Sequence, residues 1–239
     1  MKILVTRPAH DQAALAARLE ALGHEAVPFP LLTIEPLEFS LPDLSGFMGL
    51  VFTSANGVRA TIGKMDVDKS SNLQVLTVGD VTAAAVREAG FANVVPAGDN
   101  VDDLGAHLVK TYGGKDNKFL HLAGTSRAGD LNSLTGPGGP AIEVIEVYRA
   151  VAAADLTDLV VASIKANQID GAILMSPRTA EIYASLILDA GFGSGAGKYV
   201  HYCLSANVAK ALDPLQLPQN RVEIAMRPDL EMLLALIGK

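Results

Sequence analysis

The sequence of 239 residues contains one cysteine, no tryptophan and few aromatic residues, which make up 5% of the chain. A single cysteine, Cys203, cannot form a disulfide within the chain, and this favours a reducing cytoplasm. A core with so few rings has to be aliphatic, and the hydrophobic fraction of 49% is large enough to build one. No run of about 20 apolar residues occurs, so we expect no membrane-spanning helix. The short apolar run before Arg7 predicts a buried strand rather than a signal peptide.

Positive charge is also scarce, since 19 Lys and Arg face 26 Asp and Glu and the net charge is −7. Nucleic-acid binding needs a basic surface, so we expect no nucleic-acid partner. The five histidines show no HxH or HExxH spacing, which argues against a metal site. The chain has neither a phosphate-binding Gly-Lys-Ser/Thr loop nor a GxGxxG motif, and it has no GxSxG elbow.

One pattern of strands and helices occurs twice along the chain. Three segments of the first half recur in the same order in the second half: 2–36 with 118–151, 50–62 with 172–182, and 76–86 with 202–212. A duplicated pattern predicts two similar lobes with a cleft between them. Because strands alternate with helices, the sequence predicts an α/β protein with parallel sheets.

Parallel α/β sheets bind ligands beyond the carboxyl ends of their strands. Small and polar residues occupy the turns at these ends, three turns in each copy of the pattern. The candidate binding residues in these turns are Thr6, Arg7, Ser54, Ala55, Asn56, Gly57, Gly79, Thr82, Ser126, Arg127, Ser176, Arg178, Thr179, Ser205 and Asn207.

Each of these candidates also has an ordinary structural explanation. The turn at Ser54 can bind an anion at a helix N-terminus or simply cap that helix. After Gly79, we expect Asp80 or Thr82 to cap the next helix. The arginines can clamp a carboxylate, or they can form surface ion pairs worth less than about 1 kcal/mol. Tyr148 can donate a proton, or it can be a packing residue with a hydrated hydroxyl.

Four segments, taken in order, resemble the uroporphyrinogen-III synthase family. No single segment is very specific, but their order and spacing hold over essentially the whole chain. The segments are Leu4-Val5-Thr6-Arg7-Pro8, Phe52-Thr53-Ser54-Ala55-Asn56-Gly57-Val58, Val78-Gly79-Asp80-Val81-Thr82-Ala83 and Val147-Tyr148.

The resemblance implies two flavodoxin-like lobes, each a doubly wound and mainly parallel sheet, joined by a two-stranded β connector. It implies a crossed chain, with residues 1–33 and 152–239 in one lobe and residues 40–144 in the other. Residues 34–39 and 145–151 would be the connector strands.

The family converts hydroxymethylbilane, a linear tetrapyrrole, to uroporphyrinogen III in haem biosynthesis. The reaction inverts the last pyrrole, ring D, through a spiro intermediate and loses water without a cofactor, as a lyase. The resemblance implies that Tyr148 is the catalytic acid and that the turn residues bind the substrate. We further expect a cytoplasmic monomer with hydroxymethylbilane synthase as a transient partner. A carboxylate-rich substrate requires a neutral or positive site in this acidic chain, or binding by backbone amides.

The second copy departs from the family pattern Gly-x-x-Thr-Ala, because the chain has Val208 where the threonine usually stands. Ser205 or Asn207 would have to supply the missing hydrogen-bond donor. This departure keeps an inactive homologue open. A bilobed protein that binds a small molecule without chemistry is a separate alternative.

Overall fold

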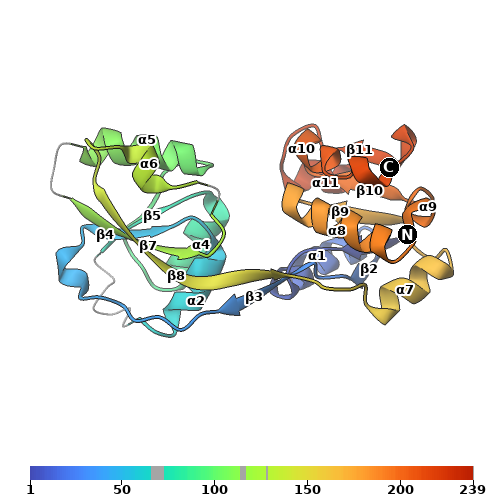
Figure 1. Cartoon of the computed structure of the whole chain (residues 1–239), viewed down its shortest axis with the longest axis horizontal. Coiled ribbons are helices and arrows are strands. Elements are labelled where there is room, and N and C mark those ends of the chain that lie inside the picture. The colour runs from blue at the N-terminus through green and yellow to red at the C-terminus, as the bar shows by residue number, and fades with distance from the viewer. Residues whose placement is uncertain (66–72, 114–116, 128, 239) are drawn as a thin grey trace. The chain divides into compact units, whose positions relative to one another are not determined.

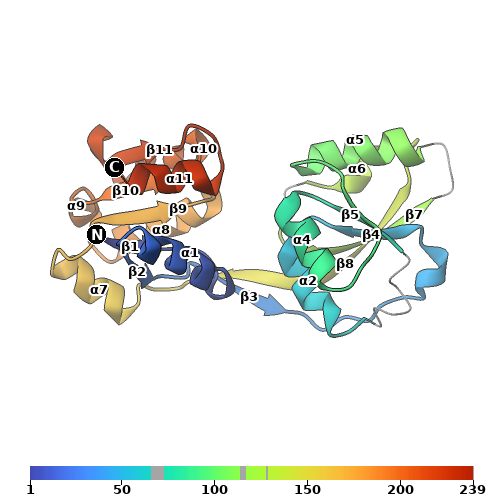
Figure 2. The same ribbon diagram turned by 180° about the vertical axis from the view of Figure 1, so that it is seen from behind.

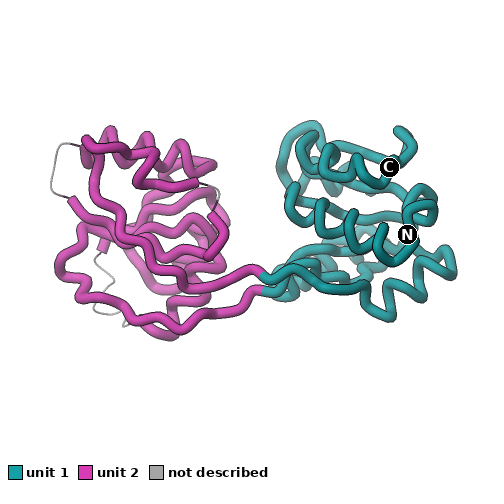
Figure 3. The backbone as a smooth tube through the Cα atoms, viewed as in Figure 1, with its two compact units in different colours: residues 1–33, 151–239 teal, residues 34–150 magenta. Residues whose placement is uncertain are grey.

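The computed structural model describes residues 1–65, 73–113, 117–127 and 129–238. The chain divides into two compact units, which are described separately below (Figure 3). Unit 1 comprises Met1–Thr33 and Val151–Lys239, and unit 2 comprises Ile34–Ala150. In the part of the chain that is described, no helix is long and apolar enough to cross a membrane.

Unit 1 contains a five-stranded parallel sheet with the strand order β2-β1-β9-β10-β11. In the order of the chain within this unit, the strands therefore lie as 2-1-3-4-5, which is the flavodoxin-like order. The strands are β1 (Lys2–Val5), β2 (Glu25–Pro28), β9 (Gly171–Leu174), β10 (Val200–Cys203) and β11 (Val222–Ile224). The helices are α1 (Ala9–Ala21), α7 (Asp158–Lys165), α8 (Pro177–Asp189), α9 (Gly193–Ala196), α10 (Ala206–Lys210) and α11 (Leu230–Ile237).

Alternating side chains of the unit 1 strands build a core on each face of the sheet. Leu4 and Leu174 pack on one face with residues of α7, α8 and α10. Ile3 and Ile173 pack on the other face with residues of α1 and α11. Figure 1 shows α8 in front of this sheet, and Figure 2 shows α1 and α11 on its opposite side. The unit is thus a sheet covered by helices on both faces, as strands with such continuous burial require.

Unit 2 contains a six-stranded sheet with the order β6-β5-β4-β7-β8-β3. Its strands are β3 (Leu32–Pro36), β4 (Gly49–Phe52), β5 (Gln74–Thr77), β6 (Val94–Pro96), β7 (Lys118–Gly124) and β8 (Ala141–Ala152), and β4 to β8 run parallel. Its helices are α2 (Ala55–Ile62), α4 (Asp80–Glu88), α5 (Val101–Tyr112) and α6 (Leu131–Thr135). Strand β3 lies at the edge, as its terminal proline predicts.

The unit 2 sheet is also covered on both faces. Val51 and Phe119 pack with α5 and α6, whereas Leu50, Phe52 and Leu120 pack with α2 and α4. Figure 1 shows α5 and α6 together along one side of this unit. Both units are therefore doubly wound α/β layers, which confirms the fold class predicted from the sequence.

The first strand of each sequence repeat lies in a sheet with strands of the other repeat. Strand β1 pairs with β9, with Leu4 opposite Ala172, and strand β7 pairs with β4, with Leu120 opposite Leu50. The Thr6 hydroxyl donates to the Ile173 carbonyl at 2.7 Å and so reinforces the β1–β9 pairing. Neither unit is thus one copy of the repeat.

Strands β3 and β8 carry the chain between the units. The Leu37 amide donates to the Val147 carbonyl at 3.0 Å, and the Ala153 amide donates to the Leu31 carbonyl at 3.0 Å. Residue numbers rise on one strand as they fall on the other, so this two-stranded connector is antiparallel. An ion pair of 2.7 Å between Arg149 and Glu35 lies along it.

The close approach of α2 to β7 depends on Gly57. A Cβ atom on this residue would lie 2.7 Å from the Leu122 carbonyl oxygen, a backbone atom of a central strand. We expect Gly57→Ala to lower the free energy of unfolding by about 2 kcal/mol, because overpacking forces the helix off the sheet. Gly63→Ala is the matched control, since a Cβ there has no neighbour within 4 Å. Urea denaturation measures both, and equal stability of the two variants would contradict the packing described.

Candidate functional site

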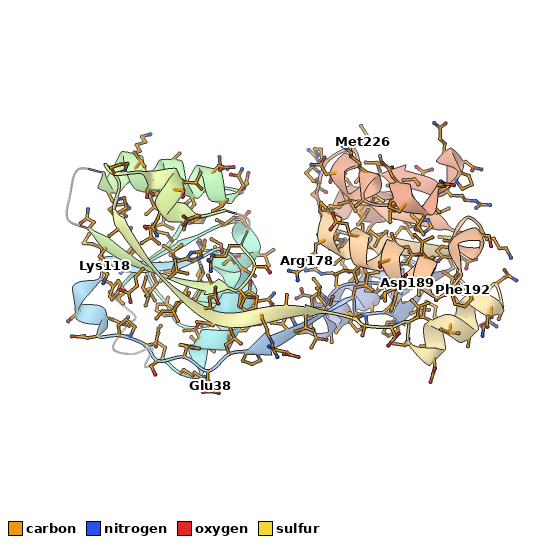
Figure 4. The ribbon with its side chains drawn as sticks, in the orientation of Figure 1. Glu38, Lys118, Arg178, Asp189, Phe192 and Met226 are labelled. Carbon is orange, nitrogen blue, oxygen red and sulfur yellow. The ribbon has the colours of Figure 1, made fainter. Side chains whose placement is uncertain are left out.

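Each sheet has one place where the strand order reverses, between β1 and β9 in unit 1 and between β4 and β7 in unit 2. At such a switch point the connections leave in opposite directions, and a crevice opens beyond the carboxyl ends of the strands. A pocket lies at this position in each unit. Lys118 marks the opposite, amino end of β7 (Figure 4).

The unit 2 pocket has a volume of about 440 Å³. It is formed by residues of the neighbouring strands β7 and β8, by the turns that follow β4 and β7, and by the start of α5. Its lining includes Thr53 and Ser54 after β4, His121, Gly124, Ser126 and Arg127 from β7 and the turn that follows, Tyr148 from β8, and Asp99, Asn100, Val101 and Asp102 around the start of α5.

His121 is a buried polar group in the wall of this pocket. Its side chain is 2% exposed, and its Nε2 atom lies 3.1 Å from the Thr53 hydroxyl in a hydrogen bond. Burial, with a smaller effect of the Arg127 charge, lowers the pKa of His121 from 6.5 to about 4. The imidazole is therefore neutral at pH 7, and it offers hydrogen bonding without charge.

Tyr148 brings a phenol to the same pocket. The residue is 9% exposed, and none of the described residues forms a hydrogen bond with its hydroxyl. A phenolic hydroxyl can both donate and accept a hydrogen bond. The Tyr148 hydroxyl can therefore form a hydrogen bond with a bound molecule.

The side chains that line the unit 2 pocket carry no excess of positive charge. Arg127 forms an ion pair of 2.9 Å with Glu146, and Asp99 and Asp102 lie in the same lining. Asn100 caps α5 by accepting a hydrogen bond from the Asp103 amide at 2.9 Å. The first turn of α5 thus adds the partial positive charge of a helix N-terminus to this pocket.

The unit 1 pocket is smaller, about 270 Å³, and is lined by Thr6, Arg7, Pro8, Asp11, Leu32, Met175, Ser176 and Thr179. Arg7 forms an ion pair of 2.9 Å with Asp11. Ser176 caps α8 by accepting a hydrogen bond from the Thr179 amide at 3.2 Å. The polar groups of this pocket thus bond mainly with one another.

Comparison with known proteins assigns the family. The family model described as uroporphyrinogen-III synthase HemD matches residues 13–235. The chain belongs to the uroporphyrinogen-III synthase family. It is 27% identical over 198 residues to the uroporphyrinogen-III synthase of Chlorobaculum parvum, which covers 77% of this chain and 78% of that protein.

Solved structures of the family share the fold. The uroporphyrinogen-III synthetase of Helicobacter pylori matches with a TM-score of 0.64 at 17% identity, over 99% of this chain and 97% of that one. A mutant uroporphyrinogen III synthase of Thermus thermophilus matches with a TM-score of 0.55 at 14% identity, over the same 99% and 97%. These structures thus show the same fold.

The structure divides the predicted site residues into three groups. The unit 2 pocket brings together Ser54, Ser126, Arg127 and Tyr148, and the unit 1 pocket brings together Thr6, Arg7, Ser176 and Thr179. The remaining candidates are not among the described residues that line either pocket: Ala55, Asn56, Gly57, Gly79, Thr82, Arg178, Ser205 and Asn207.

Packing explains several residues of the third group. Thr82 is buried, and the cap of α4 is Gly79 at φ +72° instead of the predicted Asp80 or Thr82. The backbone at residue 79 has a positive φ, which favours glycine. Because glycine has no side chain, the start of α4 has no side-chain cap. Arg178 lies exposed at the start of α8 (Figure 4).

The departure from the family pattern at Val208 also has a packing explanation. Val208 is 1% exposed and belongs to the core that contains Tyr183 of α8. Its amide donates to the capping hydroxyl of Ser205 at 3.4 Å. A valine at this position contributes apolar contacts to unit 1, and the helix start keeps its cap.

Sequence reasoning missed Thr53, His121 and the first turn of α5. One signal was present, because His121 is a polar residue inside the apolar run Phe119-Leu120-His121-Leu122-Ala123. A buried polar side chain inside a central strand needs a partner, and Thr53, directly after the neighbouring strand β4, provides it.

The lowered pKa of His121 predicts a loss of stability in acid. Between pH 6.5 and about 4 the unfolded chain binds a proton at this histidine that the folded chain does not. The free energy of unfolding therefore falls as the pH falls through this window, by up to about 1.4 kcal/mol for each pH unit. We expect His121→Gln to reduce this slope in urea denaturation, whereas the exposed-site control His10→Gln keeps it. An unchanged slope in His121→Gln would contradict the buried, neutral imidazole.

Proposed function

We propose that this chain is an active uroporphyrinogen-III synthase, which cyclises hydroxymethylbilane to uroporphyrinogen III with inversion of ring D. The observation that carries this proposal is the family match over residues 13–235. The pocket of unit 2 supports it, because the family's tyrosine motif lies there beside the ends of β4 and β7.

The reaction removes one water from the substrate as the ring closes. The bond between the hydroxymethyl carbon and its oxygen breaks, and this carbon bonds to the ring D carbon that already carries the methylene bridge to ring C, which gives the spiro intermediate. The bond between ring D and that bridge then breaks, and the bridge carbon bonds to the other α-carbon of ring D. That second α-carbon finally loses its proton. The hydroxymethyl oxygen needs a proton to leave as water. The number of protons is balanced, because the proton given to the leaving oxygen is matched by the one lost from carbon.

Tyr148 is the proposed donor of that proton. Tyr148 lines the pocket, and its hydroxyl forms no hydrogen bond with any described residue. General acid catalysis requires the donor within hydrogen-bond reach of the leaving oxygen. The rest of the protein then has to hold the linear substrate so that the required pyrrole carbon attacks, which is catalysis by orientation.

Substrate carboxylates would be bound by several weak donors rather than by one positive cluster. The proposed binding residues are those of the two pockets: Thr6, Arg7, Ser54, Ser126, Arg127, Ser176 and Thr179. Arg7 and Arg127 already face Asp11 and Glu146, so a substrate carboxylate would share or replace these partners. The amides of the first turn of α5 are further candidates. We also propose that Arg178, Ser205 and Asn207 of unit 1 bind the substrate, although they do not line its pocket.

The finer properties of this enzyme are proposed on the same basis. We assign it to the lyases and propose that it acts without a cofactor, as a cytoplasmic monomer. Hydroxymethylbilane synthase is the proposed transient partner, since it would supply the substrate. We also propose residues 1–33 with 152–239, and 40–144, as the two lobes of the working enzyme, with residues 34–39 and 145–151 as the connector.

Genetic complementation separates an active enzyme from an inactive homologue or a protein that only binds. We expect the chain to restore growth of a bacterial strain that lacks uroporphyrinogen-III synthase. Gly63→Ala, which alters an exposed helix end outside both pockets, serves as the control and should also restore growth. Soluble expression without rescue would contradict the proposed activity.

The role of Tyr148 is tested by Tyr148→Phe, which removes one hydroxyl and keeps the ring. We expect the initial rate of uroporphyrinogen III formation to fall about tenfold, because one proton donor is lost while orientation remains. The rate is read with purified protein and freshly made hydroxymethylbilane. An unchanged rate would make Tyr148 a packing residue.

A further inference from the structure

The end of the β7–β8 ladder contains an irregularity next to Tyr148. The two strands pair regularly from Lys118 opposite Ala141 to Ala123 opposite Glu146, and the next pair is Gly124 with Tyr148. Val147 is therefore an extra residue in β8. Such bulges change the direction of a side chain and are common beside active sites.

The backbone at the bulge is held from both strands. The Thr125 amide donates to the Tyr148 carbonyl at 3.0 Å, so the pairing continues beyond Gly124. Tyr148 thus starts from a fixed main-chain position. Only the direction of its ring remains to be set by its neighbours.

Gly124 is the neighbour on which the tip of this ring rests. A Cβ atom on residue 124 would lie 2.7 Å from Tyr148 Cζ, 2.9 Å from its hydroxyl oxygen and 3.0 Å from Cε2. These three nearest atoms all belong to the far end of the ring, and none is a backbone atom. A side chain at residue 124 would therefore displace the hydroxyl before it displaced the strands.

The position of the hydroxyl depends on this contact because hydrogen bonds do not supply an alternative. Among the described residues, none forms a hydrogen bond with the Tyr148 hydroxyl, and both Tyr148 and Gly124 line the unit 2 pocket. The phenol is therefore placed by packing of its ring. A rigid ring has few torsions, so a shift at its tip is not absorbed within the side chain.

We propose that Gly124 is a positioning residue that fixes the Tyr148 hydroxyl for proton donation by leaving its own Cβ position empty for the end of the ring. The proposal rests on the proposed role of Tyr148. It assigns a catalytic reason to a glycine that would otherwise be explained by strand packing alone.

The test is a double-mutant cycle with Gly124→Ala and Tyr148→Phe. We expect Gly124→Ala to lower kcat about tenfold with KM changed less than about twofold, since a displaced hydroxyl is as ineffective as a missing one. In the Tyr148→Phe background, Gly124→Ala should lower kcat no further, because the two changes remove the same group. Gly63→Ala, also in unit 2, should keep the rate of the original chain.

Two kinetic results would overturn the proposal. One is a Gly124→Ala enzyme with the original kcat. The other is a double variant in which the two losses multiply to about a hundredfold, which would show that Gly124 acts independently of the hydroxyl.

A measurement that needs no enzymatic activity tests the positioning role of Gly124 independently of the proposed function. The chain has five tyrosines, so protein labelled with 3-fluorotyrosine gives a small set of ¹⁹F resonances, and Tyr148→Phe identifies that of Tyr148. Gly124→Ala should move this resonance and leave the other four in place. An unmoved Tyr148 resonance would overturn the positioning role even in an active enzyme. A moved resonance in an inactive chain would support the contact while the proposed function failed.

A second substitution tests the contact even if Gly124→Ala does not fold well enough to assay. If Gly124→Ala is too unstable to assay, Gly124→Ala/Tyr148→Leu should recover a cooperative urea transition, because leucine removes the end of the ring that a Cβ would meet. No recovery would show that residue 124 clashes with something other than Tyr148, and the proposal would be wrong.

Discussion

The parallel pairing of β1 with β9 is the interaction on which unit 1 depends. It joins residues far apart in the chain, and the Lys2 amide donates to Asp170 Oδ2 at 2.7 Å across a separation of 168 residues. Ile3, Leu4 and Val5 are buried at both faces of the resulting sheet. The same pairing creates the switch point at which the unit 1 pocket opens. Its counterpart in unit 2, β4 with β7, creates the larger pocket that holds His121 and Tyr148.

Much of the fold follows from local sequence, and the exceptions come from packing. Gly23 has φ +79° directly after α1, as a left-handed helix end requires. Leu131–Thr135 forms a short helix because Leu131 is buried against the sheet. Asp80 and Thr82 were the predicted caps of α4, but the cap is Gly79, and the Thr82 side chain is buried in the core. Propensity fixed the kind of element, whereas tertiary contacts moved its ends.

The site was only partly predictable, and the reason is strand order. Sequence shows which turns follow strands, and it therefore identified six polar turns, although not the one that opens α5. It does not show which two strands flank the switch point, and of the predicted turn residues only those beside that point line the pockets. Ser54 and Ser176 meet this condition, whereas Ser205, after β10, does not. His121 stayed unassigned because its partner Thr53 lies 68 residues away and becomes a neighbour only through β-sheet register.

In the proposed mechanism, ring inversion depends on the orientation of the bound substrate, and Tyr148 makes a single proton transfer. The isomer composition of the product tests this most directly, because cyclisation without the enzyme gives the type I isomer. Purified chain with hydroxymethylbilane should yield mainly uroporphyrinogen III, separated from the type I isomer by chromatography. Accumulation of the type I isomer alone, at any concentration of folded protein, would contradict the account.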